Sequence, residues 1–551
     1  MRRFSSIDFM RGFAIWMMIM FHVIMRWYDG SWIQDGELDG VPMVGLLFFL
    51  IVVYFSAWAG FFLLVSSIGN MISMYRNLER GKSWKKVMMF QIVGGLLLLM
   101  AAFLVESTIG YHAFFGYAVE GKFHRWTTIL YRGFHMETIH TIAFCIIVNG
   151  IVQGLLSRNG GHLKVKRNVR IYALLAVLSV ALTGPVYKVL RMMVPGYPFA
   201  KWESSVVGSL DVQYPVIGES GIWDILLKAF MFPLGGNPEP LFPYLAITFI
   251  GSIIGIYLCQ KECPRKLPRN GILIGVGLAL TGLIGTVVVI AMGIGDPERL
   301  MDNFYQPPGL YPSLWLWWFL FLTGGQLAGV LLVLRLVEFR GMGREFALST
   351  LSIRRYGYVA FSVYTYQFID AIPRALMGLF PFVSRRWPYP ENIGWWLPVL
   401  VMMPMTLLLW EIVLRGWEKA EYVGGMEWCM AKVAEKVLPG RRERTEGRRR
   451  WWQAARLNAR EYLYRPEWLN IVEKDEVDHK RREESKLALS LALGGLFFFP
   501  LAPASLWIGR TSMKVEGRNV MNYAAVVVSL ITMVIYAGLF IALFFVPAPS
   551  F

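Results

Sequence analysis

The stretch SIDFMRGFAIWMMIMFHV (residues 6–23) places charged and titratable groups at both ends of an apolar run. Asp8 and Arg11 stand at its start, and His22 stands near its end. The run over 12–28 has the length of a helix that crosses a bilayer, for which about 17–25 residues suffice. Ionisable groups in such a helix are costly and usually functional, so this stretch predicts a membrane helix that carries part of a site.

The rest of the chain has the same apolar character. Hydrophobic residues make up 56% of the 551 residues, and aromatic residues gather at the ends of apolar runs, as in YPSLWLWWFL (311–320). That placement is typical of the belts at a membrane surface. The fold class predicted is an all-α polytopic membrane protein. We expect about ten helices in the main bundle, over 12–28, 43–66, 87–106, 136–156, 171–193, 241–260, 271–294, 313–337, 357–380 and 395–415.

Composition divides the chain into three parts. Residues 1–415 form the bundle, 416–484 a basic linker, and 485–551 a C-terminal hairpin of two spans over 487–508 and 521–546. The charge blocks within the linker predict a solvated or lipid-facing segment. The hairpin loop GRTSMKVEGR (509–518) is basic although helix parity places it outside. A re-entrant first segment, helped by Pro500 and Pro503, would remove that conflict.

Charge follows the same pattern. The formal net charge is +17, and Lys and Arg gather in the loops after every second span, whereas the first opposite loop is acidic. This bias predicts a multi-pass protein of the cell membrane with a cytoplasmic N-terminus. The basic residues therefore serve topology, and no nucleic-acid partner is expected. The four cysteines form no metal-binding or disulfide pattern.

Helical geometry places the polar groups of the first span on one side. At about 100° per residue, Arg11 and His22 differ by only about 20° around the axis and are about 16 Å apart along it. Asp8 is an i,i+3 neighbour of Arg11. We expect Arg11 at the inner surface and His22 in the outer half. The alternatives are an Asp8–Arg11 ion pair that only anchors the helix end, and a His22 that only bonds a neighbouring helix.

A second cluster lies in YRGFHMETIHTIAF (131–144), at the outer start of the fourth span. Glu137 and His140 share a helix face at i,i+3, and His135 precedes them. These residues either orient a catalytic histidine, bind an acceptor, or form a structural hydrogen-bonded cluster. Di-iron bundles need two Glu-x-x-His motifs, and the chain has one such cluster, so no metal is expected.

The opening stretch resembles the transmembrane acyltransferase superfamily, which includes the acyltransferase-3 proteins and the heparan-alpha-glucosaminide N-acetyltransferases. Its Asp-x-x-Arg-Gly motif, followed by an Arg-x10-His spacing, matches Asp8, Arg11 and His22. PEPLFPYLAITFIGSIIG (238–255) is similar to a later family helix that starts with Pro-x-x-Pro and an aromatic residue. RRYGYVAFSVYTYQFID (354–370) is similar to a late helix with Gly, Ser and Tyr; many members have His at the position of Gln367.

The resemblance implies transfer of an acyl group, most simply acetyl, from cytoplasmic acyl-CoA to a glycan or lipid-headgroup acceptor outside. His22 would act as general base or acyl carrier, a role that suits imidazole near neutral pH. Glu137 and His140 would complete the catalytic set, and Arg11, Asp8 and Arg3 would lie at the coenzyme phosphates. No metal cofactor is implied.

Two other function classes remain open from the residues. One is a transporter or flippase with a polar relay through Asp8, Arg11 and His22. The other is a non-catalytic subunit of a membrane assembly. In each case the chain contacts membrane lipids, and a homo-oligomer or larger membrane complex is compatible with it. The absence of a convincing internal repeat in the sequence favours the enzyme over the transporter.

Overall fold

The computed structural model describes residues 2–27, 54, 59–110, 113–119, 136–193, 221–235, 239–291, 314–377, 379, 396–437, 459–464, 466–472, 482–496 and 501–544. Within these ranges the chain is helical except for turns and one pair of two-residue strands. The protein is therefore an all-α polytopic membrane protein, as predicted. It divides into unit 1 (Met1–Arg26, Ser56–Arg386 and Val399–Ile471) and unit 2 (Trp27–Phe55, Trp387–Pro398 and Val472–Phe551).

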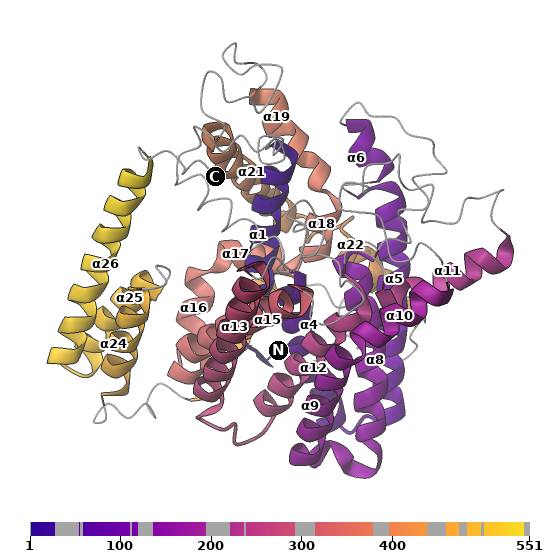
Figure 1. Ribbon diagram of the computed structural model, residues 1–551, viewed down its shortest axis with the longest axis horizontal. Helices are drawn as coiled ribbons and strands as arrows, with labels where there is room; N and C mark the ends of the chain where they lie inside the picture. Colours follow the sequence, from indigo (N-terminus) through magenta and orange to yellow (C-terminus); the bar gives the residue numbers. More distant parts are fainter. Residues whose placement is uncertain are drawn as a thin grey trace. The chain divides into compact units, whose positions relative to one another are not determined.

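Most of the long helices lie in the first half of the chain, up to Ala291 (Figure 1). The described helices up to that residue are α1 (Ser5–Trp27), α4 (Ala59–Glu79), α5 (Trp84–Thr108), α6 (Phe114–Val119), α8 (Thr138–Leu156), η2 (Arg158–Leu163), α9 (Val165–Ala181), α10 (Thr183–Met193), α11 (Ile222–Gly235), α12 (Leu241–Leu258) and α13 (Leu267–Ala291).

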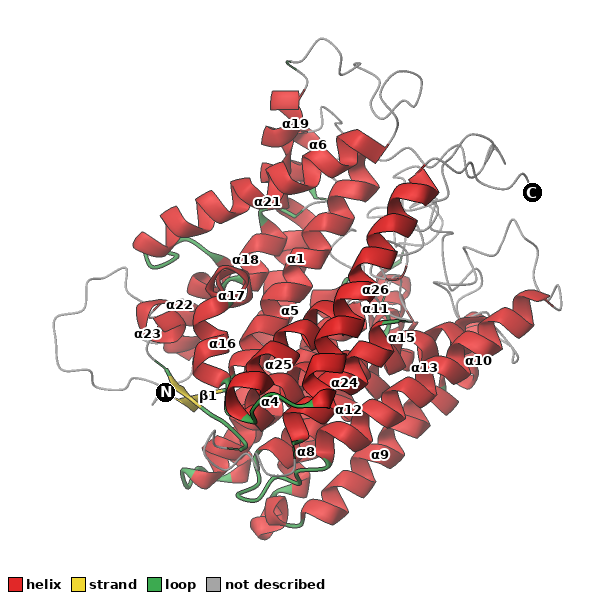
Figure 2. Ribbon diagram, turned by 90° about the vertical axis from the view of Figure 1, so that its left-hand side faces the viewer, coloured by secondary structure: helices red, strands yellow, loops and turns green. Residues whose placement is uncertain are grey.

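The second half of unit 1 contains two long helices, α15 (Leu314–Val337) and α21 (Trp396–Lys419), and several short elements (Figure 2). The short elements are η6 (Glu338–Arg340), α16 (Gly343–Ser349), α17 (Leu351–Tyr358), α18 (Ala360–Thr365), η7 (Gln367–Asp370), α19 (Ala371–Met377), α22 (Met426–Val437) and α23 (Ala459–Tyr464). Strand β1 (Arg2–Arg3) pairs in parallel with β2 (Glu467–Trp468).

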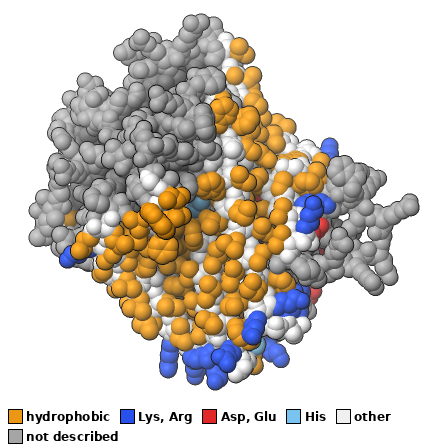
Figure 3. Space-filling view, turned by 90° about the vertical axis from the view of Figure 1, so that its right-hand side faces the viewer, with side chains coloured by type: hydrophobic (Ala, Val, Ile, Leu, Met, Phe, Trp, Pro, Cys, Tyr) orange, Lys and Arg blue, Asp and Glu red, His pale blue; other side chains and the backbone are white. Residues whose placement is uncertain are grey.

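Seven of the described helices are long and apolar enough to cross a membrane, or eight if α9 and α10, bent by 45°, form one span. Their outward faces carry large apolar side chains, such as Met100, Leu104 and Val177, that are more than half exposed. Figure 3 shows such a face, with hydrophobic side chains across it and Lys and Arg along its lower rim. Lipid covers a surface of this kind.

The long helices of unit 1 pack as neighbours: α13 lies against α15, α5 against α8, and α12 between α4 and α9. At the start of α1, Arg76 of α4 lies 6.0 Å from the ring of Phe4, and the Tyr75 hydroxyl donates to the carbonyl of His162 at 3.1 Å. We call this end of unit 1 the basic end, because its loops are rich in Lys and Arg. The predicted second span, 43–66, lies largely outside the described residues, and α4 continues to Glu79.

The predicted ninth span, 357–380, is wrong as a single helix. The chain there forms α17, α18, η7 and α19, with non-helical backbone at Val359 and Tyr366. The break at Val359 frees the backbone N–H groups of Phe361 and Ser362, which donate to the Glu427 carboxylate of α22. A side chain outside the span thus satisfies groups that an unbroken helix would pair internally. We call residues 351–377 the broken segment.

Helix α1 runs parallel to the broken segment. A Cβ added at Gly12 would overlap the carbonyl oxygen of Ile353, and one added at Gly357 would lie 2.6 Å from the carbonyl oxygen of Asp8. The two backbones therefore touch directly. Further along, Gln367 contacts both Met18 and His22.

The expected solvated linker is partly folded. Residues 459–464 and 466–472, which we call the return segment, lie against the N-terminal residues of the chain. The backbone N–H of Leu469 donates to the carbonyl of Arg3 at 2.7 Å, and that of Ile471 donates to the carbonyl of Glu338 at 2.9 Å. The composition of this stretch predicted a solvated or lipid-facing segment, but its backbone pairs with the bundle instead.

Unit 2 contains α24 (Glu483–Gly495), α25 (Leu501–Val515) and α26 (Val520–Phe544). The predicted span over 487–508 is wrong: α24 and α25 are each too short to cross a bilayer. The Glu516 carboxylate accepts the backbone N–H groups of Glu484 and Ser485 at 2.9 and 3.0 Å. Because the end of α25 meets the start of α24, the two helices form a tight hairpin. A re-entrant segment, which the sequence left as the alternative, would have this arrangement.

The contact between α1 and α17 leads to a stability prediction. In Gly357→Ala the new methyl group meets backbone atoms that cannot rotate away, and such overpacking costs about 1–3 kcal/mol. Thermal unfolding in detergent should show a lower midpoint. The matched control is Gly277→Ala in α13, where an added Cβ meets no atom within 4 Å and alanine favours the helix. Equal midpoints for the two variants would contradict the close approach.

The tight hairpin of α24 and α25 leads to a labelling prediction. In a background without Cys145, Cys259, Cys263 and Cys429, single cysteines replace the exposed Arg482 or Arg518. A membrane-impermeant maleimide added to sealed vesicles should label both positions from the same side, and permeabilised vesicles give the total labelling. Two spanning helices would instead place these positions on opposite sides.

Candidate functional site

The basic end of α1 holds an ion pair that the sequence did not predict. The Arg3 guanidinium donates to the Asp8 carboxylate through Nε at 3.0 Å and Nη2 at 2.9 Å. The Tyr462 hydroxyl donates to the same carboxylate at 2.9 Å, and the Arg3 guanidinium carbon lies 3.6 Å from the centre of the Tyr462 ring. Burial raises the pKa of Tyr462 to about 12 despite the opposing effect of Arg3, so this phenol keeps its proton.

Arg11 is not the partner of Asp8. Within the described residues, the Arg11 guanidinium has no hydrogen bond or ion pair, so the Asp8–Arg11 ion pair considered as an alternative is not formed. The bidentate fork of Arg3 fits the carboxylate better than an i,i+3 neighbour can. Arg11 extends instead from α1 toward α4, where a Cβ added at Gly69 would lie 2.4 Å from Nη2. A half-buried cation thus occupies a space that a glycine leaves open.

Two arginines of α17 bind the return segment. Arg354 is fully buried, and its Nη1 donates to the carbonyls of Ala347 at 2.8 Å and Leu463 at 3.2 Å. Its guanidinium carbon lies 4.3 Å from the centre of the Trp468 ring. The return segment therefore closes over the basic end beside Asp8 and Arg3.

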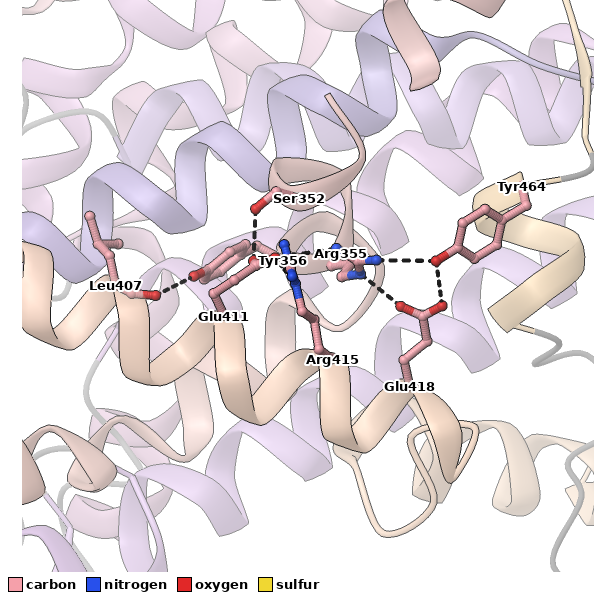
Figure 4. A network of polar contacts seen from close by, with 8 residues as sticks. All are labelled: Ser352, Arg355, Tyr356, Leu407, Glu411, Arg415, Glu418 and Tyr464. Atoms are coloured by element: carbon pink, nitrogen blue, oxygen red, sulfur yellow. Dashed lines mark hydrogen bonds and ion pairs between the residues drawn. The ribbon is translucent and has the colours of Figure 1, made fainter. Parts of the chain in front are cut away.

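Figure 4 shows the neighbouring network around Arg355. Its guanidinium donates to Glu418 of α21 at 2.7 Å, to Glu411 at 3.2 Å and to the Tyr464 hydroxyl at 3.1 Å. The Tyr464 hydroxyl in turn donates to Glu418 at 2.7 Å. These contacts join α17, α21 and α23. The charges of Arg355, Glu411 and Glu418 are therefore paired with one another and hold these helices together.

His22 lies three turns beyond Arg11 on α1. Its Nδ1 contacts the amide oxygen Oε1 of Gln367, which is fully buried in η7. The Gln367 amide nitrogen donates to the sulfur of Met18 at 3.5 Å. The imidazole therefore points into unit 1, toward the broken segment, and not into lipid.

A third group of polar residues lies one turn before Gln367 along the broken segment. The Tyr364 hydroxyl donates to the buried Glu106 carboxylate of α5 at 2.6 Å. Glu137, which precedes α8, and Glu239, which precedes α12, also act electrostatically on Tyr364. Burial and the Glu137 carboxylate raise the pKa of Glu239 to about 8, so this acid carries its proton at neutral pH.

The start of α8 holds the remaining predicted site residues. The Glu239 backbone N–H donates to the carbonyl of Met136 at 3.0 Å, and its carbonyl accepts the Thr141 hydroxyl. His140 is buried one helical turn from Glu137, with both ring nitrogens shielded from solvent. His135 lies outside the described residues. No cluster of His, Cys, Asp and Glu in the described part of the chain could hold a metal ion.

The structure thus joins the predicted residues differently from the sequence expectation. Asp8 and Arg3 pair with each other, whereas Arg11 stands apart from both. His22 contacts Gln367. Tyr364 lies one turn before Gln367 in the broken segment, near Glu137. Sequence reasoning gave no role to Tyr462 or Tyr364, and no pattern in their neighbourhood signals one.

No family model and no curated protein matches this chain. The site must therefore be interpreted from its own chemistry. That chemistry consists of a cation at one end of a helix face, an imidazole held at Nδ1 further along the same face, and carboxyl and phenol groups beside it. Such a set can bind an anion, move a proton and bind hydroxyl groups.

Proposed function

We propose that this chain is an integral membrane acyltransferase of the cell membrane. It would transfer an acyl group, most simply acetyl, from acyl-CoA on the cytoplasmic side to a glycan or lipid headgroup on the other side. The observation that carries the proposal is the face of α1, where Arg11 has no described partner and His22 has its Nδ1 held by Gln367. The positive charge of the basic end supports placing that end, and the N-terminus, in the cytoplasm.

His22 would act on the acceptor. Its Nε2 takes the proton of an acceptor hydroxyl or amine, whose oxygen or nitrogen then attacks the thioester carbon. The carbon–sulfur bond breaks, and the coenzyme thiolate leaves and is protonated. Base catalysis of this kind contributes about 10²–10⁴-fold. Direct attack of Nε2 on the thioester, followed by transfer from an acyl-imidazole, uses the same groups.

Arg11 would bind the coenzyme. A guanidinium recognises phosphate through several donors at once, and that of Arg11 is not engaged by any described carboxylate. Arg3 is committed to Asp8, so both residues would support the binding region and not contact phosphate themselves. The distance of about 16 Å between Arg11 and His22 requires a donor with a long flexible arm, and the apolar Ile15 and Met18 lie along this route.

The acceptor would bind at the other end of the face. Glu106, Glu137 and Glu239 act electrostatically on Tyr364. His140 follows Glu137 by one helical turn, so this region offers carboxyl, imidazole and phenol groups. Hydrogen-bonding groups of both kinds, donors and acceptors, suit an acceptor rich in hydroxyls.

A transporter is the second candidate, and the broken segment favours it. Discontinuous helices near the middle of the membrane form substrate sites in many transporters. In that case His22 and Gln367 would take part in a relay and no group transfer would occur. The same purified protein distinguishes the two, because only the enzyme consumes acyl-CoA.

Replacement of the imidazole tests the chemistry. Purified protein with labelled acetyl-CoA and a crude glycan or lipid acceptor should release free coenzyme and transfer label. His22→Ala should lower this rate at least about 10²-fold because the base or carrier is lost. His162→Ala, in η2 at the basic end, is the matched histidine control and should retain the rate. Unchanged turnover in His22→Ala would contradict the proposal.

Replacement of Arg11 tests the donor site. Arg11→Gln keeps a polar side chain of similar length but removes the charge, and it should raise the KM for acetyl-CoA about tenfold or more, since a charge-assisted contact contributes about 1.5–3 kcal/mol. Coenzyme affinity can be measured in parallel by calorimetry in detergent. The exposed Arg158→Gln, also at the basic end, should leave KM unchanged. Equal effects of the two variants would indicate only a general loss of positive charge.

A further inference from the structure

Gln367 is the described residue that the structure connects most directly to His22. It begins η7, just after the second break of the broken segment, and its side chain is fully buried. Its two amide atoms have separate partners, with Oε1 toward His22 Nδ1 and Nε2 toward the Met18 sulfur. Both partners are on α1, one turn apart, so the Gln367 amide bridges one turn of that helix.

The broken segment is held firmly on each side of this residue. The Trp410 indole N–H of α21 donates to the Asp370 carboxylate at 3.0 Å, at the end of η7. The Tyr364 hydroxyl donates to Glu106 one turn before Gln367. Glu427 caps the start of α18. The amide is thus placed by contacts to three other helices, which is the support that a positioning group needs.

The chemistry of the contact defines the state of the imidazole. An amide oxygen can only accept a hydrogen bond, so the contact requires a proton on Nδ1. In the neutral ring Nε2 then carries the lone pair, as the proposed reaction requires. A carboxylate would fix the same tautomer, but it would add a buried negative charge at membrane depth, which is costly. The amide fixes the tautomer without that charge.

We propose that Gln367 is the positioning residue of His22, selecting the Nδ1–H tautomer and presenting Nε2 to the reacting groups. This inference rests on the proposed function for its role in turnover, and on the geometry alone for the tautomer. Arg26 follows His22 by one turn of α1, and Arg11 precedes it by three turns. Around the broken segment the charged or titratable groups include Tyr366, Tyr364 with its partner Glu106, and Asp370.

The first test is kinetic. Gln367→Leu removes the acceptor and should lower kcat about 10–100-fold, the usual effect of losing a group that orients a ligand or base, with the KM for acetyl-CoA within twofold. Gln367→Glu keeps the acceptor and adds charge that stabilises the imidazolium. It should retain activity at high pH, with the acid limb of the pH–rate profile moved up by about one unit. Gln326→Leu, another buried glutamine replacement, should leave kcat and the profile unchanged.

The second test needs no activity. In protein labelled with ¹⁵N-histidine, the signals missing from His22→Ala identify the His22 ring. That ring should show a protonated Nδ1 in the unaltered chain and a mixture of tautomers in Gln367→Leu. The same tautomer in both proteins, or an unchanged kcat and pH profile in Gln367→Leu while His22→Ala is inactive, overturns the positioning role. An unaltered chain that never consumes acyl-CoA but shows the tautomer change overturns only the proposed function.

Discussion

The direct contact between the backbones of α1 and α17 is the constraint on which the site depends. Because no side chain separates Gly12 from Ile353 or Gly357 from Asp8, the rotation of α1 about its axis is fixed. That rotation determines where Arg11 and His22 point. It also sets the register in which Met18 and His22 meet Gln367 further along the same parallel pair. A shift of one residue would turn this face of α1 by about 100°.

Polar groups in unit 1 change in character along α1. At the basic end the pairs are charged, as in Arg3 with Asp8 and Arg355 with Glu418. Further along, the partner of His22 is a neutral amide. This order follows the cost of placing charge away from water, which rises toward the middle of a membrane. Arg11, without a described partner, is the exception along this face, and such an exception is what makes a residue a candidate for binding.

The sequence predicted what periodicity and composition control. The helical class, the position of α1 and the shared face of Arg11 and His22 all follow from apolar spacing, and the structure contains each of them. The broken segment could not be predicted because VAFSVYTYQFID contains no proline or glycine. The N–H groups freed at its first break bind Glu427, and its Tyr364 binds Glu106; both glutamates are distant in sequence. Likewise, Arg3 rather than Arg11 pairs with Asp8 because the return segment brings Tyr462 to the same carboxylate.

The side chains that bind the start of α1 and the broken segment have a consequence for biosynthesis. Helix α1 is translated before its partners: the carboxylate that accepts the N–H of Ser6 belongs to Glu338, and the phenol that binds Asp8 belongs to Tyr462. The backbone N–H groups freed in the broken segment also have no carboxylate acceptor until Glu427 has been translated. Helix α1 is therefore completed by residues that are translated several hundred positions after it. A chain halted after its tenth apolar run would hold every residue of the proposed catalytic face and still lack two of the groups that fix it in place.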